Sequence, residues 1–259
     1  MPSDISYTAL ALAGGTLESD FRSAGYKVAN KAYLPLCGVP MIARVLGALR
    51  AARCVGRIRC ITPAGALAEW EEYAKLCDER IDPGRDLIDS LLAGLAGMDD
   101  DELALVAATD IPLLTAKAVD AFAERTRDVK DIGYGCVDRE AHRKAYPQVR
   151  HTWVRLRDGT FCGAGLSVLR VGAAVRLATL LREFAAARKS PLRLAALFSP
   201  VLIARLLLGR VSLAELQSRA RRLSGLDCQA IRCTEAELAV NVDCLADLRA
   251  VEAILAKRR

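Results

Sequence analysis

The opening segment constrains the fold most, because an apolar run over residues 7–13 ends in the pair Gly14-Gly15. Such a run followed directly by glycines predicts a buried strand that ends in a tight turn. Glycine lets backbone N–H groups come close to a ligand, and Lys31 follows on the same long loop. Backbone amides and a lysine charge together suit a polyphosphate. The alternative is a plain turn followed by a solvated lysine.

Two common phosphate-binding motifs are absent from this segment. A Walker A loop needs Gly-Lys-Ser/Thr at a fixed spacing, and the sequence after Gly15 reads Thr-Leu-Glu-Ser-Asp. The dinucleotide fingerprint needs a third glycine and a helix directly after the turn, and the pattern after Gly15 offers neither.

Strands and helices alternate along the first half of the chain. This alternation predicts a mainly parallel sheet with helices on both faces, and ligands of such sheets bind beyond the carboxyl ends of the strands. The expected strands cover residues 7–13, 57–62, Leu103–Ala108 and 131–137, and the expected helices cover 41–52, 64–75, 86–96 and 115–126.

The second half of the chain is less regular. We interpret residues 172–223 as a helical insertion into one domain, with a break around Ser190-Pro191 and a capping box, Ser212 to Glu215, that opens its last helix. The other expected elements are a hairpin of 151–157 with 161–169, a strand at 229–233 and a closing helix, Leu245–Lys257.

Composition limits the possible functions. The 259 residues are 53% apolar with a net charge of +6, which allows a full core and suits an anionic small substrate. No basic tract alternates with aromatic residues, so we expect no nucleic-acid partner. Nine cysteines without a CxxC pair argue against a disulfide framework or a zinc site, and with no visible secretory signal they predict a cytoplasmic protein.

The most hydrophobic stretch is 192–209, and Arg193, Pro200 and Arg205 interrupt it. Its uncharged core is shorter than the roughly 20 residues that a bilayer span needs, so we expect no transmembrane segment. We interpret the stretch as buried helices, and contact with a membrane surface is the alternative. Its apolar residues recur at helical spacing and need a cover, which predicts a lid or subunit surface, and with it a homodimer or an acceptor with an apolar tail: Leu194, Leu197, Leu202, Ile203 and Leu206.

Three polar residues are placed to carry chemistry. Asp110 follows the strand Leu103–Ala108, where a carboxylate beside a phosphate loop is well placed for Mg²⁺. Asn241 and Asp243 precede the last helix, and residues two apart in an extended segment face the same way. The alternatives are a turn aspartate at 110 and a helix cap at 243.

Other charged residues receive weaker interpretations. The acidic run 99–102 precedes a strand, which is typical of a solvated loop, so we give it no role. His142 lies in a charged segment and is expected to be solvated, whereas Arg150 and His151 could face an acceptor. Serines and cysteines have no histidine at a recognisable spacing, so the residues favour phosphoryl-type transfer by positioning and charge neutralisation.

The order of these motifs resembles that of the MobA-like NTP transferases, a superfamily of nucleotidyltransferases. The resemblance extends over residues 7–250, and the matching segments are Leu12-Ala13-Gly14-Gly15, Lys31, Gly38-x-Pro40-Met41, Asp110-x-Pro112 and Asn241-x-Asp243-x-x-x-Asp247-Leu248. It implies a three-layer α/β/α fold of the GT-A, Rossmann-like type, with a mixed, mainly parallel sheet in one domain, 1–259.

The resemblance also implies roles for individual residues. The nucleotide would lie over Leu12-Ala13-Gly14-Gly15, with Lys31 on its phosphates and Mg²⁺ held by Asp110 and Asp243. Lys31 and Asp110 would be the catalytic residues. The stretch 82–95, with Asp82 and Gly94, falls where such enzymes contact base and ribose.

The leading hypothesis is a Mg²⁺-dependent enzyme that moves an NMP from an NTP onto a phosphate-bearing small molecule and releases pyrophosphate. Family members often carry Gly-x-Gly-x-Arg at the first turn, and this chain lacks that arginine unless Arg22 replaces it. A catalytically impaired nucleotide-binding module is therefore one alternative. A nucleotide-sugar glycosyltransferase of the same fold is another, although Asp99-Asp100-Asp101 matches its metal motif only formally.

Overall fold

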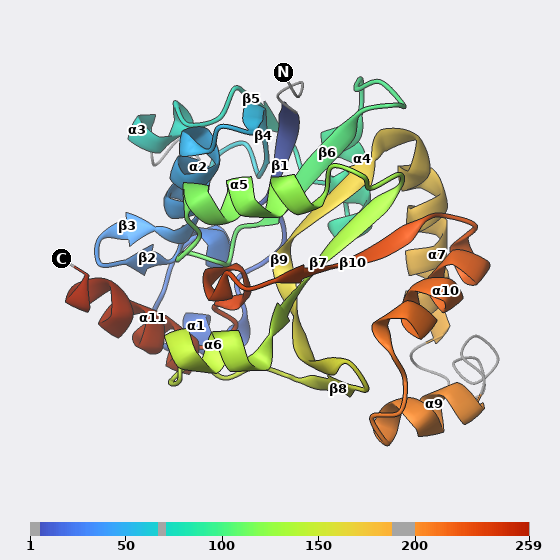
Figure 1. The fold of residues 1–259 in the computed structure, drawn as a ribbon. Coiled ribbons are helices and arrows are strands. Elements are labelled where there is room, and N and C mark those ends of the chain that lie inside the picture. Colours follow the sequence, from blue (N-terminus) through green and yellow to red (C-terminus); the bar gives the residue numbers. More distant parts are fainter. Residues whose placement is uncertain (1–5, 67–70, 188–199, 259) are drawn as a thin grey trace.

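The structure is a computed structural model that describes residues 6–66, 71–187 and 200–258. Its main sheet has eight strands (Figure 1): β1 (Tyr7–Leu12), β4 (Val55–Ile61), β5 (Glu79–Ile81), β6 (Leu103–Ala108), β7 (Ile132–Asp138), β8 (Val154–Leu156), β9 (Gly159–Arg170) and β10 (Cys228–Cys233). Their order is β10-β7-β9-β6-β1-β4-β5, and β8 pairs with β9. Strand β9 runs antiparallel to β6, β7 and β8, whereas all other pairs are parallel. The predicted mixed, mainly parallel sheet is confirmed.

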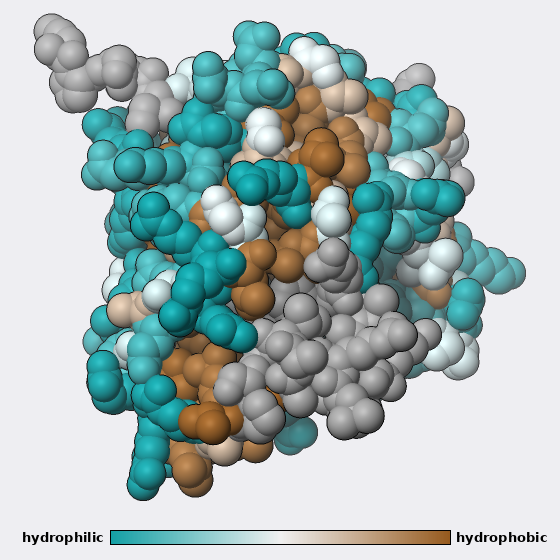
Figure 2. All heavy atoms as spheres, turned by 90° about the vertical axis from the view of Figure 1, so that its right-hand side faces the viewer, coloured by the Kyte–Doolittle hydropathy of each residue, from teal (hydrophilic) through white to brown (hydrophobic). Residues whose placement is uncertain are grey.

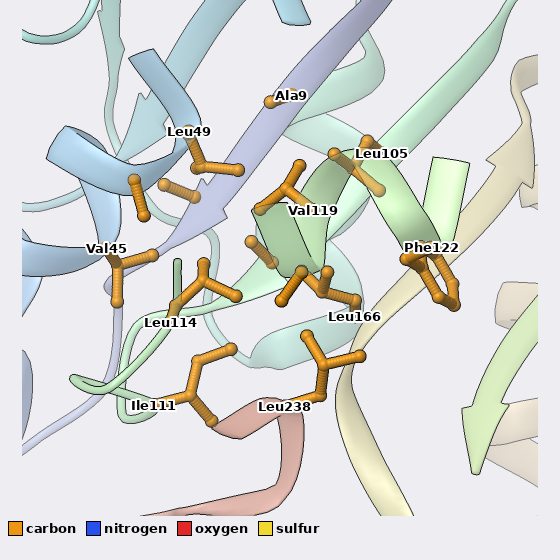
Figure 3. Close-up of a cluster of buried hydrophobic side chains, with 14 of the residues drawn as sticks. Ala9, Val45, Leu49, Leu105, Ile111, Leu114, Val119, Phe122, Leu166 and Leu238 are labelled. Carbon is orange, nitrogen blue, oxygen red and sulfur yellow. The ribbon is translucent and has the colours of Figure 1, made fainter. Parts of the chain in front are cut away.

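One face of the sheet is covered by α2 (Met41–Ala51) and α5 (Ala116–Arg125), which pack on the core shown in Figure 3. The side chains of Ala9 and Ala11 on strand β1 lie in this core, in the same buried cluster as large side chains of the two helices such as Leu49 and Phe122. Because neighbouring strand residues point to opposite faces, Leu10 lies in the core on the other side. The run 7–13 is apolar at every position except Thr8 because both of its faces are covered.

The opposite face is covered by α4 (Leu87–Leu95), α7 (Ala174–Ala187) and α10 (Leu213–Ser224) (Figure 1). Leu10, Leu95 and Leu169 belong to the buried cluster on this side. With helices on both faces, the molecule has the three layers that the sequence predicts.

A third buried cluster lies beyond the carboxyl end of β1. It joins α1 (Ser19–Ser23), the hairpin β2 (Pro35–Leu36) with β3 (Val39–Pro40), and α11 (Leu245–Lys257). Phe21, Leu36 and Leu248 are among its fully buried members. This cluster fixes the position of the long loop after Gly15 and of the start of α11.

Several boundaries agree closely with the sequence analysis because local chemistry sets them. Thr115 caps α5 through its side chain, and Ser212 and Glu215 form the expected capping box of α10. Strand β6 and helix α11 begin and end at the predicted residues.

Several elements differ from the prediction, and the short α1, β2 and β3 are among those that were not predicted. In the helix predicted for 64–75, residues 64–66 form a turn and only α3 (Glu71–Ala74) is helical among the described residues, with 67–70 outside them. The strand predicted for 151–157 is limited to β8. Strand β5 and helix α6 (Arg139–Ala145) were not predicted, because both are short and rich in charge.

The helical block, residues 172–223, contains α7, α9 (Pro200–Leu207) and α10. Leu194, Leu197 and the expected break at Ser190-Pro191 lie outside the described residues. The interpretation of 192–209 as buried helices is wrong for α9, because Val201 is 67% and Leu207 83% exposed. Among the described residues, no helix is both long and apolar enough to cross a bilayer.

Candidate active site

Three of the predicted site residues, Lys31, Asp110 and Asp243, meet at the carboxyl ends of β1 and β6, beside the start of α11. The backbone N–H of Val242 donates to the carbonyl of Asp110 at 2.9 Å, which joins segments that are far apart in the sequence. Thr109 donates from Oγ1 to the carbonyl of Leu12 at 2.8 Å and so links the ends of the two strands. These bonds bring the first turn, Asp110 and Asp243 to one place.

Lys31 lies at the centre of this arrangement. Its Nζ is 2.7 Å from Oδ2 of Asp110 and 2.7 Å from Oδ1 of Asp243, and Oε1 of Glu18 is 3.9 Å away. The Asp243 side chain is 69% exposed, whereas that of Asp110 is 16% exposed. The lysine thus bridges the mostly buried carboxylate of Asp110, after the carboxyl end of β6, and the exposed carboxylate of Asp243, just before α11.

Asn30 explains why Lys31 points inward. Its buried side chain donates from Nδ2 to the carbonyl of Ala13 at 2.7 Å and accepts the N–H of Ala32 at 3.0 Å. That second bond caps the short 3₁₀ turn η1 (Lys31–Tyr33). Asn30 therefore ties the lysine turn to the strand end that carries the two glycines.

The charge balance of the site keeps Lys31 protonated. Burial on its own lowers the pKa of this lysine, but the charges and hydrogen bonds of Asp110 and Asp243 outweigh burial and raise the pKa above its ordinary value. Asn241 adds a hydrogen bond from Nδ2 to Oδ1 of Asp110 at 3.3 Å. Asn241 and Asp243 thus face the same site, as their spacing predicts.

Asp243 does not cap α11. Oδ2 of Asp247 instead accepts from the backbone N–H groups of Asp243 and Cys244, just before the helix, both at 3.1 Å, and Oδ2 of Asp20 accepts from the N–H of Leu245, the first helical residue, at 3.1 Å. The Asp243 side chain is therefore left to Lys31.

A cleft of about 390 Å³ opens beside Lys31 and Asp110. Its walls come from the first turn, the ends of β6 and β9, and the start of α4, and they are mostly apolar. The lining residues are Leu12, Gly14, Asn30, Lys31, Ala32, Leu87, Val106, Ala108, Thr109, Asp110, Tyr134, Ala164, Gly165, Leu166 and Ser167.

The other residues predicted to bind nucleotide lie around the cleft and do not line it. Ala13 is buried, and Gly15 is exposed with φ +96°, a left-handed conformation that favours glycine. Asp82 is 68% exposed on its side chain and pairs with Arg80 at 2.7 Å. Gly94 serves helix packing, because a Cβ there would come within 2.9 Å of Ile61.

A second cavity, of about 800 Å³, lies on the Asp243 side and is lined by Arg150 and His151 as well as by Asn241 and Asp243. Arg150 and His151, which the sequence places opposite an acceptor, therefore face a cavity beside Lys31 and its two aspartates. Burial lowers the pKa of His151.

Tyr134 is a site residue that the sequence analysis missed. It lines the first cleft and is 50% exposed, and its hydroxyl packs against Gly163 of the second cavity, where a Cβ would clash with it. The sequence does contain a hint of this role. Tyr134 stands between Gly133 and Gly135, so it has no large neighbours on its own strand and leaves space around its ring.

The expectation that His142 is solvated is wrong. His142 is fully buried on α6, with its ring 4.7 Å from that of His151 and 5.5 Å from that of Trp153, measured between centroids. Neither ring nitrogen has a hydrogen-bond partner among the described residues. Burial, with the neighbouring His151, lowers the pKa of His142 to about 4.

The donor set at Lys31 suits a magnesium ion. Two carboxylate oxygens already converge on one cationic group, and Mg²⁺ commonly takes one or two carboxylates and completes its shell with waters and substrate phosphates. Among the described residues, no group of three or more His, Cys, Asp or Glu side chains forms a ready metal cage. The site therefore fits an ion that arrives with a phosphate ligand.

Comparisons with known proteins identify the family. The family model described as the MobA-like NTP transferase domain matches residues 9–230. A hypothetical transferase from Thermus thermophilus superposes with a TM-score of 0.80 at 32% identity, over 94% of this chain and 100% of the other. No curated protein matches.

More distant structures share the fold at lower identity. A CMP:2-keto-3-deoxy-manno-octonic acid synthetase solved with CTP has a TM-score of 0.63 at 14% identity, over 98% of this chain and all of the other. A 4-diphosphocytidyl-2C-methyl-D-erythritol synthase from Anaerococcus prevotii has a TM-score of 0.58 at 10% identity, over 98% of this chain and all of the other. The family model covers most of the chain, so this protein is a nucleotidyltransferase that belongs to the MobA-like NTP transferase family.

Proposed function

We propose that this nucleotidyltransferase moves an NMP from an NTP onto a phosphate-bearing small molecule in a reaction that needs Mg²⁺. The observation that carries the proposal is the convergence of Asp110 and Asp243 on the Lys31 ammonium beside a cleft of about 390 Å³. One domain spanning 1–259, with the helical block inserted, is part of the same proposal.

In this reaction an oxygen of the acceptor phosphate attacks the α-phosphorus of the NTP. A new P–O bond forms while the bond between the α-phosphorus and the bridging oxygen breaks, and pyrophosphate leaves with that oxygen. The transition state carries extra negative charge on the phosphoryl oxygens, so preorganised positive charge is the main catalytic resource.

Each residue then has a stated task. The turn from Leu12 to Gly15 offers backbone N–H groups to the phosphates, and Lys31, kept charged by its two partners, neutralises them. Asp110 and Asp243 would hold Mg²⁺, which supplies charge neutralisation to the phosphates when bound. Asp82 and Gly94 mark the segment proposed for base and ribose, and Arg150 in the second cavity offers a charge for an anionic acceptor.

The structure of the distant relative with bound CTP supports an NTP as substrate, since that protein shares this fold. A second candidate function is a nucleotide-binding module without turnover. It is favoured by the cleft lining, in which Lys31 is the one cationic residue among those described, and by the exposed position of Arg22 on α1, away from that lining.

The deciding experiment combines binding and turnover. The four NTPs are screened with Mg²⁺ by thermal shift, because a ligand that binds the native state raises its stability by mass action. Pyrophosphate release is then measured with the preferred NTP and a panel of phosphorylated acceptors. Release that chelation of Mg²⁺ abolishes is the expected result, whereas tight binding without release across the panel would establish the module instead.

A further inference from the structure

The described part of the helical block carries nearly all of the excess positive charge of the chain. Residues 172–187 and 200–223 hold seven arginines against two glutamates, a net charge of +5, whereas the whole chain has 37 basic and 31 acidic residues, a net charge of +6. The other residues therefore sum to +1. A charge so concentrated in one element predicts attraction to an anionic partner.

The same block exposes most of the large apolar side chains that lie open. Eight large hydrophobic residues are exposed in the described part of the chain, and five belong to the block: Val175 (68%), Leu181 (39%), Val201 (67%), Leu207 (83%) and Leu208 (61%). Figure 2 looks onto the side of the molecule where α7, α9 and α10 lie and shows apolar patches between hydrophilic residues.

Helix α9 exposes apolar side chains to solvent and turns its charged side chain toward the protein, the reverse of an ordinary surface helix. Val201, Ala204 and Leu207 are exposed on the helix, and the exposed Leu208 follows directly after its last residue. Its charged residue, Arg205, turns instead to α10 and pairs with Glu215 at 2.7 Å. A soluble helix normally buries its apolar stripe, so this stripe is presented to a partner.

A cationic pocket lies directly beside this stripe. It measures about 470 Å³ and is lined by Leu202 and Arg205 of α9, by Ser212, Ala214, Glu215, Ser218, Arg219 and Arg222 at α10, and by Arg157. Four arginines against one glutamate, together with two serine hydroxyls, suit a phosphate group.

We propose that the helical block binds the surface of an anionic lipid bilayer, with the apolar side chains of α9 inserted and the arginines on the lipid phosphates. A basic helical surface with exposed aliphatic residues is the arrangement of interfacial membrane helices. A second copy of the chain is disfavoured as the occupant, because its identical face would bring +5 against +5. A folded acidic protein would need pockets matched to protruding side chains, whereas the hydrocarbon of a bilayer accepts them without a matched shape.

The first test is flotation of the full chain with vesicles, without nucleotide, at low and high salt. Vesicles of equal parts phosphatidylcholine and phosphatidylglycerol should carry the protein, vesicles of pure phosphatidylcholine should not, and rising salt should release it. Equal flotation with both vesicle types, or none with either, would overturn the proposal.

Two pairs of substitutions assign the binding to the block. Arg210→Ser with Arg222→Ser should lower the partition coefficient about 25-fold, since each basic residue near an anionic surface contributes about 1 kcal/mol. Arg143→Ser, which removes an exposed charge from α6 on another face, is the matched control and should leave partition within about twofold. Equal losses in the control would place the binding elsewhere.

Leu207→Ser with Leu208→Ser should lower partition at least tenfold, because aliphatic burial contributes about 0.8 kcal/mol per methylene. Leu207→Met with Leu208→Met keeps both residues apolar and should restore binding. Light scattering without vesicles tests whether a second copy of the chain binds this face instead. A dimer that the two serine substitutions dissociate would overturn the proposal. Should the leucine variants not fold, the arginine pair and the salt series still decide. Because no nucleotide is used, failure here leaves the proposed reaction intact.

Discussion

The proposed nucleotide cleft and the helical block differ in how their charges are arranged. At the cleft, Lys31 is held between Asp110 and Asp243 at 2.7 Å each, so charges of both signs face one another around a small space. In the block, positive charge is in excess and lies next to exposed leucines and valines. Paired charges around a cleft suit a small charged ligand, whose own charges can replace one partner of each pair. Unpaired positive charge beside apolar groups suits an extended anionic surface.

The largest effect is expected from Lys31→Ala. The loss of the ammonium removes charge neutralisation from the phosphates and leaves Asp110 and Asp243 facing each other, so pyrophosphate release should fall by about 10³-fold. Lys27→Ala removes an exposed lysine from the same loop and serves as the control. Release at the wild-type rate from Lys31→Ala would remove this residue from the mechanism.

Asp110→Asn and Asp243→Asn should each lower turnover by about 10²-fold and raise the Mg²⁺ concentration needed for half-maximal rate. If both oxygens hold one ion, the double variant should be little worse than either single one, as for residues that act as a unit. Asp99→Asn, in the acidic run without a role, is the control. Losses that add, with an unchanged Mg²⁺ requirement, would speak for structural roles of the two aspartates.

The burial of His142 makes the stability of the protein depend on pH. Its pKa falls from 6.5 to about 4 on folding, so between these values the unfolded chain binds a proton that the native protein does not. Stability should therefore fall as the pH drops from 6.5 to 4, by on the order of 3 kcal/mol from this residue alone. Urea unfolding of His142→Phe should show a shallower decline over this range, and an unchanged slope would contradict the buried neutral histidine.

The smallest effect is expected from Ser212→Ala in the block. Ser212 accepts the N–H of Glu215 at 3.2 Å, and Glu215 in turn accepts from Arg205, so the cap also supports the contact between α9 and α10. Loss of such a cap costs about 1 kcal/mol. Urea unfolding measures this loss, with Ser218→Ala on the same helix as the control, and an equal loss in both would show that the capping box contributes nothing specific.

Local chemistry explains which parts of the fold could be predicted from the sequence. The caps at Thr115 and Ser212 and the apolar run of β6 are properties of a few neighbouring residues, and the structure places them as expected. Helix α6 escaped prediction because its sequence lacks an apolar stripe, and its buried His142 depends on rings from residues 146–153 that meet it only in the folded chain.

The site was predictable to the extent that the order of motifs resembles the family. The contact of Lys31 with Asp243 joins residues 212 positions apart, which no local pattern reveals. Tyr134 depends on the pairing of β7 with β9, and the outward stripe of α9 depends on which face its neighbours cover. Periodicity in the sequence singles out Leu202, Ile203 and Leu206, which are partly buried in the structure, and so does not identify the outward side chains.

The central claim is that Lys31, Asp110 and Asp243 exchange their mutual contacts for a nucleotide and its metal. The most direct measurement is a crystal structure with a non-hydrolysable α,β-methylene NTP and Mn²⁺, with the metal located by its anomalous signal. The account predicts a peak at the carboxylates of Asp110 and Asp243, with the Lys31 ammonium moved onto the phosphates. A nucleotide bound elsewhere, or one bound in the cleft while Lys31 stays between its two aspartates and no peak lies there, would contradict it.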